Sequence, residues 1–202
     1  MSPGGAEDAD VMGEWLAGWD RWLFEAVNHG HRNALFDAIM PALEAKRVFV
    51  VAAVLAGGAL LVWGGSKGRW AVGALLLAVL MADRGAAWVK VLVARPRPCY
   101  TLPAVSLLHT GCTGSYAFPS THATNLFAAG TVLTRYYPRW AWAFAFVATA
   151  ISYARVYGGA HYPGDALGGA VLGVAAGALA AAGAQAVRDA WRRRQERSIV
   201  PP

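Results

Sequence analysis

Charged residues are scarce in this chain. Asp, Glu, Lys and Arg make up 15% of the 202 residues, whereas 56% are hydrophobic. Ordinary soluble domains carry about a quarter charged residues, so this balance argues against that class. No polar linker divides the chain, so its length indicates one domain. The apolar residues lie in continuous blocks, which is typical of a helical membrane protein.

The sequence also lacks a secretory signal peptide. Residues 1–14 are acidic and glycine-rich, without the basic region and apolar core that such a peptide has. We therefore expect internal segments to direct membrane insertion and residues 1–13 to form a disordered tail. No nucleic-acid-binding pattern is present. The arginine-rich segment 188–202 follows an apolar run, which is typical of a cytoplasmic tail beside anionic lipid.

Five apolar segments predict an all-α, polytopic membrane bundle of about five transmembrane helices. They cover residues 48–65, 70–94, 120–136, 140–156 and 166–187. The second segment contains Asp83 and Arg84, which we expect to face protein and to pair, because charges are costly in lipid. The last segment is rich in glycine and alanine, which predicts close contact with neighbouring helices.

Residues 14–47 precede these segments and mix apolar with charged positions. Trp15, Trp19 and Trp22 recur at helical spacing, whereas Asp20 interrupts the apolar pattern. The pattern predicts an amphipathic helix that lies in the membrane interface, with its tryptophans at headgroup depth. A helix packed on the rest of the protein fits equally well, and a further membrane crossing is a third alternative.

Basic residues are unevenly distributed between the two ends of the predicted spans. One side holds the residues of two turns and of the C-terminal tail: Lys67, Arg69, Arg135, Arg139, Arg188, Arg192, Arg193, Arg194 and Arg197. By the positive-inside rule this side is cytoplasmic. The opposite ends of the spans then face the periplasm of a bacterial inner membrane.

Three short motifs lie at these opposite ends. They are Lys90 with Arg97-Pro98, the run Pro119-Ser120-Thr121-His122, and Arg155 with His161 and Asp165. Charge at the edge of an apolar segment is costly unless something uses it, which makes each motif a functional hypothesis. Because the motifs end or begin different spans on the same side, we expect them to converge on one face of the membrane.

In order and spacing, the motifs resemble those of the type 2 phosphatidic acid phosphatase (PAP2) superfamily, over residues 48–187. That family includes membrane lipid phosphatases, bacterial undecaprenyl-diphosphate phosphatases and soluble vanadium haloperoxidases. Two positions depart from its usual pattern: Thr121 stands in place of glycine, and Ala154 in place of serine. Thr121 adds a side chain where the backbone approaches phosphate, and Ala154 removes a hydroxyl beside Arg155. Neither departure removes a residue with a chemical role, so we still expect activity.

The cations and hydroxyls of the motifs suit phosphate binding. Lys90, Arg97 and Arg155 would neutralise charge on the phosphate oxygens, and each arginine offers two parallel donors. Lys90 alone could snorkel to the interface, and Arg155 alone could be a surface anchor. These separate roles do not explain why three cations occur together in the motifs. Ser120 and Thr121 precede a predicted helix, where a Ser120 hydroxyl cap and free N–H groups would face the anion.

The remaining motif residues suit nucleophilic catalysis. His161 is the expected nucleophile, forming a phosphohistidine. Asp165 would hold the other ring nitrogen of His161 and fix its tautomer. His122 would donate a proton to the leaving oxygen. Since the basic residues supply the electrostatic stabilisation, we expect neither a metal nor a cofactor.

Several polar residues fall outside the motifs. We interpret Arg95 as a rim residue, and we expect His29, His31 and His109 to face solvent. Both cysteines, Cys99 and Cys112, lie in the outer loop that follows the second span. In an oxidising compartment they would form a disulfide that closes this loop. Two free thiols are the alternative.

The sequence therefore predicts a membrane phosphatase that hydrolyses a lipid phosphate or diphosphate at the periplasmic face. The resemblance makes undecaprenyl diphosphate the first substrate, with phosphatidic acid, phosphatidylglycerol phosphate and lipid A 1-phosphate as alternatives. Three competing functions are a lipid phosphotransferase, a vanadate-dependent haloperoxidase and a non-enzymatic lipid-binding or transport protein. The apolar spans argue against the haloperoxidase. Membrane lipids are the expected partners, nucleic acid is not, and the oligomeric state is open.

Overall fold

The computed structural model describes residues 4–107, 112 and 114–199, and these residues contain helices but no strand. The longest of these helices, α8 (Pro163–Ile199), comes last in the chain. In chain order the elements are α1 (Gly4–Glu25), η1 (Ala26–Gly30), α2 (Ala34–Glu44), α3 (Lys46–Trp63), α4 (Gly65–Val93), α5 (Pro98–Thr101), α6 (Thr121–Tyr136), η2 (Pro138–Trp140), α7 (Ala141–Tyr157) and α8 (Pro163–Ile199). The all-α prediction is therefore confirmed.

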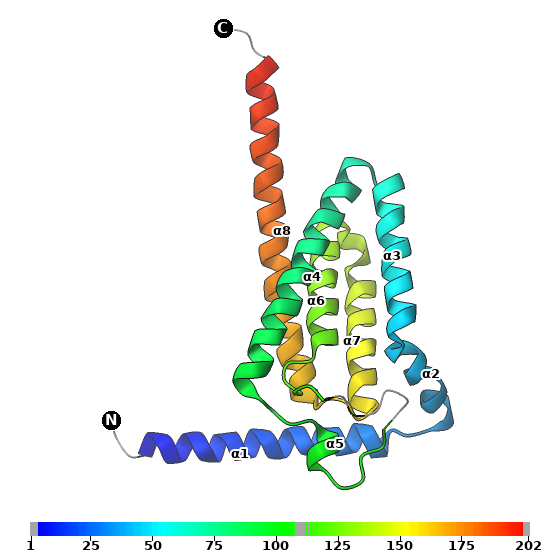
Figure 1. Cartoon of the computed structure of the whole chain (residues 1–202), viewed down its shortest axis with the longest axis vertical. Helices are drawn as coiled ribbons and strands as arrows, with labels where there is room; N and C mark the ends of the chain where they lie inside the picture. Colours follow the sequence, from blue (N-terminus) through cyan, green and yellow to red (C-terminus); the bar gives the residue numbers. More distant parts are fainter. Residues whose placement is uncertain (1–3, 108–111, 113, 200–202) are drawn as a thin grey trace.

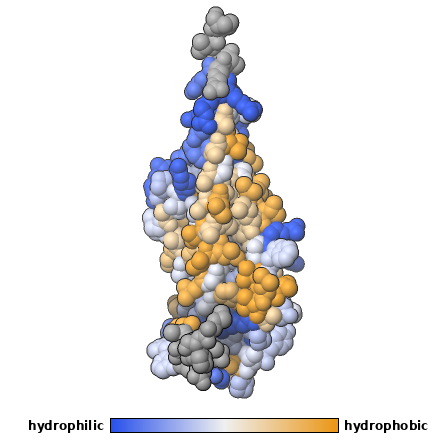
Figure 2. Space-filling view, turned by 90° about the vertical axis from the view of Figure 1, so that its left-hand side faces the viewer, coloured by the Kyte–Doolittle hydropathy of each residue, from blue (hydrophilic) through white to orange (hydrophobic). Residues whose placement is uncertain are grey.

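Helices α3, α4, α6, α7 and α8 run side by side as a bundle, and α8 continues beyond its upper end (Figure 1). Among the residues that the structure describes, two segments are long and apolar enough to cross a membrane: 65–101, which contains α4, and 163–196, in α8. Helices α3, α6 and α7 have 18, 16 and 17 residues. The count of five spans stays a prediction. Figure 2 shows apolar residues along the middle of one face and hydrophilic residues near its upper end.

The surface of α4 departs from expectation. Asp83 and Arg84 are both exposed, so the prediction that they face protein is wrong. The reason is the register of α4, in which Ala78, Ala82 and Ala86 recur every four residues on the buried face. Residues 83 and 84 follow Ala82 by one and two helical steps, which rotates them away from that face.

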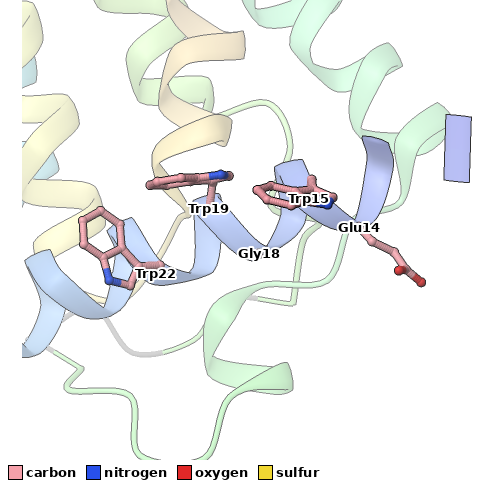
Figure 3. Close-up of a pocket in the computed structure, with 5 residues that line it drawn as sticks. All are labelled: Glu14, Trp15, Gly18, Trp19 and Trp22. Atoms are coloured by element: carbon pink, nitrogen blue, oxygen red, sulfur yellow. The ribbon is translucent and has the colours of Figure 1, made fainter. Parts of the chain in front are cut away.

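Helix α1 lies across the lower end of the bundle rather than along it (Figure 1). Trp15, Trp19 and Trp22 project from it and line a shallow apolar hollow (Figure 3), and each is more than half exposed. This placement favours the interfacial helix over a further crossing. The helix begins at Gly4, within the segment that we expected to form a tail.

Close contact between α6 and α8 brings their N-termini together. A Cβ atom added to Gly169 would lie 2.6 Å from the carbonyl oxygen of Ser120, and one added to Gly177 would lie 2.5 Å from that of Ala128. The two backbones therefore touch, as the glycine content predicts. Because both contacts advance in the same direction, the helices run parallel. Their first turns consequently sit side by side, at the end of the bundle that α1 crosses.

Candidate active site

The structure brings the three motifs together at this end of the bundle. The backbone N–H of Ser120 donates to the carbonyl oxygen of Asp165 over 2.9 Å, which joins the second motif to the third. Nη1 of Arg97 lies 3.2 Å from Nε2 of His161, which joins the first motif to the third. Five side chains of the group are buried: Arg97, Ser120, Arg155, His161 and Asp165.

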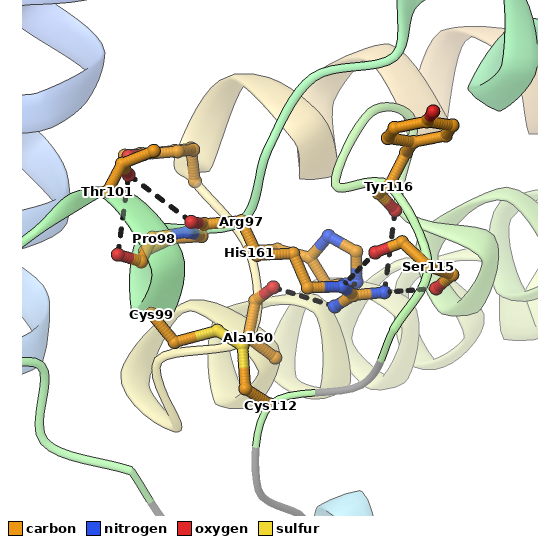
Figure 4. The surroundings of a disulfide bond; sticks show 10 residues. Arg97, Pro98, Cys99, Thr101, Cys112, Ser115, Tyr116, Ala160 and His161 are labelled. Atoms are coloured by element: carbon orange, nitrogen blue, oxygen red, sulfur yellow. Dashed lines mark hydrogen bonds between the residues drawn. A yellow bond between two sulfur atoms is a disulfide. The ribbon is translucent and has the colours of Figure 1, made fainter.

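Loop carbonyls and a hydroxyl fix the guanidinium of Arg97 (Figure 4). Its Nε donates to the carbonyl oxygen of Ser115 over 2.7 Å, and its Nη2 donates to the Ser115 hydroxyl over 2.9 Å. Its Nη1 also donates to the carbonyl oxygen of Ala160 over 2.8 Å. Cys99 and Cys112 form the expected disulfide. It ties the chain just after Arg97 to the loop that carries Ser115.

The contacts of His161 determine its tautomer. A guanidinium only donates hydrogen bonds, so Nε2 of His161 faces Arg97 with its lone pair. The ring proton then sits on Nδ1, which lies 3.5 Å from Oδ2 of Asp165. Burial lowers the pKa of His161 to about 4, and the charges of Arg97 and Arg155 act in the same direction, against the charge of Asp165. The ring is therefore neutral near pH 7, with an unprotonated Nε2.

Asp165 has a partner for each carboxylate oxygen. Its Oδ2 accepts from the backbone N–H of Tyr162 over 2.8 Å, and its Oδ1 accepts from Nη1 of Arg95 over 2.8 Å. The interpretation of Arg95 as a rim residue is therefore wrong. Its other terminal nitrogen pairs with Asp20 of α1 over 2.7 Å. An acidic residue within the tryptophan pattern of 14–29 was the sequence signal for such a partner.

Lys90 turns towards the site, whereas the Ser120 hydroxyl is held differently from what the sequence suggests. Nζ of Lys90 donates to the carbonyl oxygen of Tyr116 over 2.7 Å, so the ammonium turns towards the site loop instead of snorkelling outward. Ser120 precedes α6, but its hydroxyl makes no cap bond, and the expectation of a hydroxyl cap is wrong. That buried hydroxyl has no hydrogen-bond partner among the described residues. It is suited to a phosphate oxygen.

The remaining predicted residues that the structure describes lie in the first turn of α6 or outside the site. Thr121 and His122 lie half-buried in the first turn of α6. His29 and His31 are exposed, as expected, and His109 lies outside the described residues. Within the described part of the chain, no three His, Cys, Asp or Glu side chains gather as metal ligands would. The group that does gather consists of two buried guanidiniums and a half-buried ammonium around a histidine.

Comparison with known proteins agrees with this geometry. The sequence model of the PAP2 superfamily matches residues 70–189, more than half of the chain. The chain belongs to the PAP2 superfamily. An undecaprenyl-diphosphatase from Sulfolobus acidocaldarius is 27% identical over 166 residues, which cover 81% of this PAP2 chain and 77% of that protein. A lipid A 4'-phosphatase from Bacteroides thetaiotaomicron is 34% identical over 112 residues, or 50% and 48% of the two chains.

Solved structures share the PAP2 fold. The crystal structure of LpxE from Aquifex aeolicus superposes with a TM-score of 0.66 at 25% identity, covering 78% of this chain and 92% of that one. A transmembrane PAP2-type phosphatidylglycerolphosphate phosphatase from Bacillus subtilis gives a TM-score of 0.63 at 20% identity, covering 82% and 84%. The fold is thus that of membrane PAP2 phosphatases, and the family supports phosphatase chemistry.

Proposed function

We propose that this chain is an integral membrane phosphatase that hydrolyses a lipid phosphate or diphosphate through a phosphohistidine on His161. One observation carries the proposal: His161 is 2% exposed, with Nε2 against Arg97 and Nδ1 towards Asp165. A histidine nucleophile needs an unprotonated nitrogen and an orienting group behind the other nitrogen.

In the first step, Nε2 of His161 attacks the phosphorus atom. A P–N bond forms while the P–O bond to the leaving group breaks, and His122 donates its proton to the departing oxygen. The leaving group is the lipid alcohol of a monoester or the lipid monophosphate of a diphosphate. Lys90, Arg97 and Arg155 neutralise the charge on the other phosphate oxygens. The N–H of Arg97 that contacts Nε2 of His161 would donate to a phosphate oxygen instead once phosphorus bonds to that nitrogen.

In the second step, water attacks the phosphohistidine. His122, now without its proton, accepts one from the water as the new P–O bond forms. The P–N bond breaks, inorganic phosphate leaves, and Nε2 of His161 regains its lone pair. The buried hydroxyl of Ser120 and the N–H groups at the start of α6 bind the phosphate oxygens in both steps. These steps need no group beyond the side chains named and water.

Undecaprenyl diphosphate is the substrate that we propose first, because the Sulfolobus relative with that activity in its name aligns along most of both chains. Lipid A is the second candidate, supported by the lipid A 4'-phosphatase of Bacteroides thetaiotaomicron. Lipid A 1-phosphate, phosphatidic acid and phosphatidylglycerol phosphate present the same phosphate group and remain alternatives. Groove shape beside the site would discriminate among them.

We also propose an orientation in the membrane. The site and the tryptophans of α1 lie at one end of the bundle, whereas the arginine-rich end of α8 lies at the other (Figure 1). The positive-inside rule assigns the arginine-rich end to the cytoplasm. Five crossings, by α3, α4, α6, α7 and α8, then place the site at the periplasmic face of a bacterial inner membrane.

The test is phosphate release by the purified protein in detergent. The substrates are undecaprenyl diphosphate, phosphatidic acid, phosphatidylglycerol phosphate, lipid A 1-phosphate and lipid A 4'-phosphate. His161→Ala is run beside the parent, with His29→Ala as a control that removes an exposed histidine. We expect release that His161→Ala abolishes and His29→Ala preserves. Phosphate appearing on an added lipid acceptor would indicate a phosphotransferase. Binding without release, or equal release by His161→Ala, would contradict the proposal.

A further inference from the structure

Asp20, Arg95 and Asp165 form a chain of ion pairs that connects α1 to the base of the site. Nη1 of Arg95 contacts Oδ1 of Asp165 over 2.8 Å, and its Nη2 contacts Oδ2 of Asp20 over 2.7 Å. The remaining oxygen of Asp20 accepts the backbone N–H of Gly164 over 2.6 Å. Helix α1 is thus bonded both to the arginine behind Asp165 and to the first turn of α8.

Arg95 does not resemble a phosphate ligand in this arrangement. Both of its terminal nitrogens already bind carboxylates, and its guanidinium carbon lies 4.1 Å from the centre of the Tyr162 ring. It contacts Asp165 through Oδ1, whereas Oδ2 faces His161. Arg95 therefore acts on His161 only through Asp165, which makes it a positioning residue.

Helix α1 packs one face against the segment that carries His161 and leaves another face exposed. Phe24 lies one turn after Asp20, is fully buried and packs edge-to-face on Tyr162 with the ring centres 5.4 Å apart. Trp15 and Trp19 are more than half exposed on α1. The position of α1 thus determines where Asp20 and Phe24 meet the segment that carries His161.

The absence of a side chain at Gly164 permits the contact with Asp20. A Cβ atom added to Gly164 would lie 2.7 Å from Oδ2 of Asp20, closer than Cβ contacts in proteins allow. Gly164 does not have a left-handed backbone, so alanine would fit the helix itself. The carboxylate of Asp20 would have to move, and its bonds to Arg95 and to Gly164 would be lost.

We infer that Asp20 and Arg95 form a positioning relay, through which the docking of α1 holds Asp165 and His161 in their reactive arrangement. This inference rests on the proposed phosphatase function. It assigns a role to two residues outside the three motifs. It also predicts that the enzyme reaches its full turnover only while α1 is docked against the site.

The test measures kcat and KM of the full chain in detergent on whichever lipid the parent hydrolyses. We expect Asp20→Asn, Arg95→Gln and Gly164→Ala to lower kcat roughly tenfold to 100-fold, as misplaced reacting groups do, with little change in KM. The control for Gly164→Ala is Gly183→Ala, because a Cβ there meets open space on the same helix. The control for the charge changes is Arg21→Gln, which breaks the exposed pair with Glu25 on α1.

A double-mutant cycle separates a relay from general damage. If Asp20 and Arg95 act as one unit, Asp20→Asn with Arg95→Gln lowers kcat no further than Arg95→Gln alone. Unchanged kcat in Arg95→Gln and Gly164→Ala, beside an active parent, would overturn the relay and leave the phosphatase function standing. A rise in KM with unchanged kcat would overturn it as well. So would losses in kcat that multiply in the double variant. A parent that hydrolyses no lipid phosphate would overturn both.

Discussion

The middle of the bundle and its site end are built in opposite ways. In the middle, the core of α4, α6 and α8 consists largely of alanines, and the α6 and α8 backbones touch at glycines. At the site end, the buried charged groups Arg97 and Asp165 take their partners from loops, and Arg95 links Asp165 to Asp20 of α1. Packing in the middle of the bundle sets the positions of the helix ends, and the polar contacts at the site end then determine the chemistry. Substitutions in the two regions should therefore have different consequences.

Among substitutions that keep the nucleophile, the largest effect is expected at Asp165. Asp165→Asn keeps the size of the side chain but removes the charge that faces His161 and pairs with Arg95. By analogy with the loss of the orienting carboxylate in a catalytic triad, we expect kcat to fall by about 10³ to 10⁴. Steady-state phosphate release measures it. A variant that keeps kcat would show that the polar end does not control the chemistry.

Opening the disulfide should have a smaller effect. Cys99→Ser with Cys112→Ser frees the loop whose Ser115 holds Arg97 by its carbonyl and hydroxyl. We expect kcat/KM to fall about tenfold, equal to the loss of one well-placed hydrogen bond to a charged group. Reduction of the parent with dithiothreitol should give the same loss, whereas it should leave the double-serine variant unchanged. Equal activity of the parent with and without reductant would show that the disulfide does not affect catalysis.

Acidification should affect activity only at unusually low pH. Burial lowers the pKa of His161 to about 4, so the neutral, nucleophilic form persists well below the ordinary range of histidine. kcat/KM should stay level from neutrality down to about pH 5 and fall as the pH drops through the pKa of His161. A pH profile of the parent checks this. An acid limb near the ordinary histidine pKa would mean that the nucleophile is exposed or is another residue.

The smallest effect on turnover is expected in the middle of the bundle. A Cβ atom at Gly177 would lie 2.5 Å from the carbonyl oxygen of Ala128, so Gly177→Ala forces α6 and α8 apart. We expect a loss of roughly 1–3 kcal/mol in unfolding free energy, as overpacking costs, with kcat per folded molecule unchanged. Thermal unfolding and activity are measured together, with Gly183→Ala as the matched control. A fall in kcat of Gly177→Ala without loss of stability would mean that the middle of the bundle, like the site end, controls the chemistry.

Sequence reasoning succeeded where a pattern repeats along one segment. Spacing along the chain was enough to place the three motifs at one end of the bundle, to expect glycine-mediated contact of α8 and to pair Cys99 with Cys112. Each of these depends on helix periodicity or on a short loop. The PAP2 resemblance depended on the same motifs, and the family match over residues 70–189 confirmed it.

The misses involve contacts between distant segments. Arg95 seemed peripheral because its partners, Asp20 and Asp165, lie far away in the sequence. The buried face of α4 could not be chosen from an apolar segment in which every face is apolar, so Asp83 was assigned to the wrong side. The Ser120 hydroxyl was expected to cap α6, a local role that the structure does not give it. For Arg95 and Asp83 the tertiary neighbours, and not local propensity, decided the outcome.

Trapping of the covalent intermediate tests the central claim most directly. Substrate labelled in the transferred phosphate is mixed with the enzyme, quenched in base within one turnover, digested and analysed by mass spectrometry. We predict a phosphorylated histidine at position 161 that appears before free phosphate and is absent from His161→Ala. Phosphate released at the parent's rate with no labelled histidine at any time, or a label elsewhere in the chain, would contradict the account.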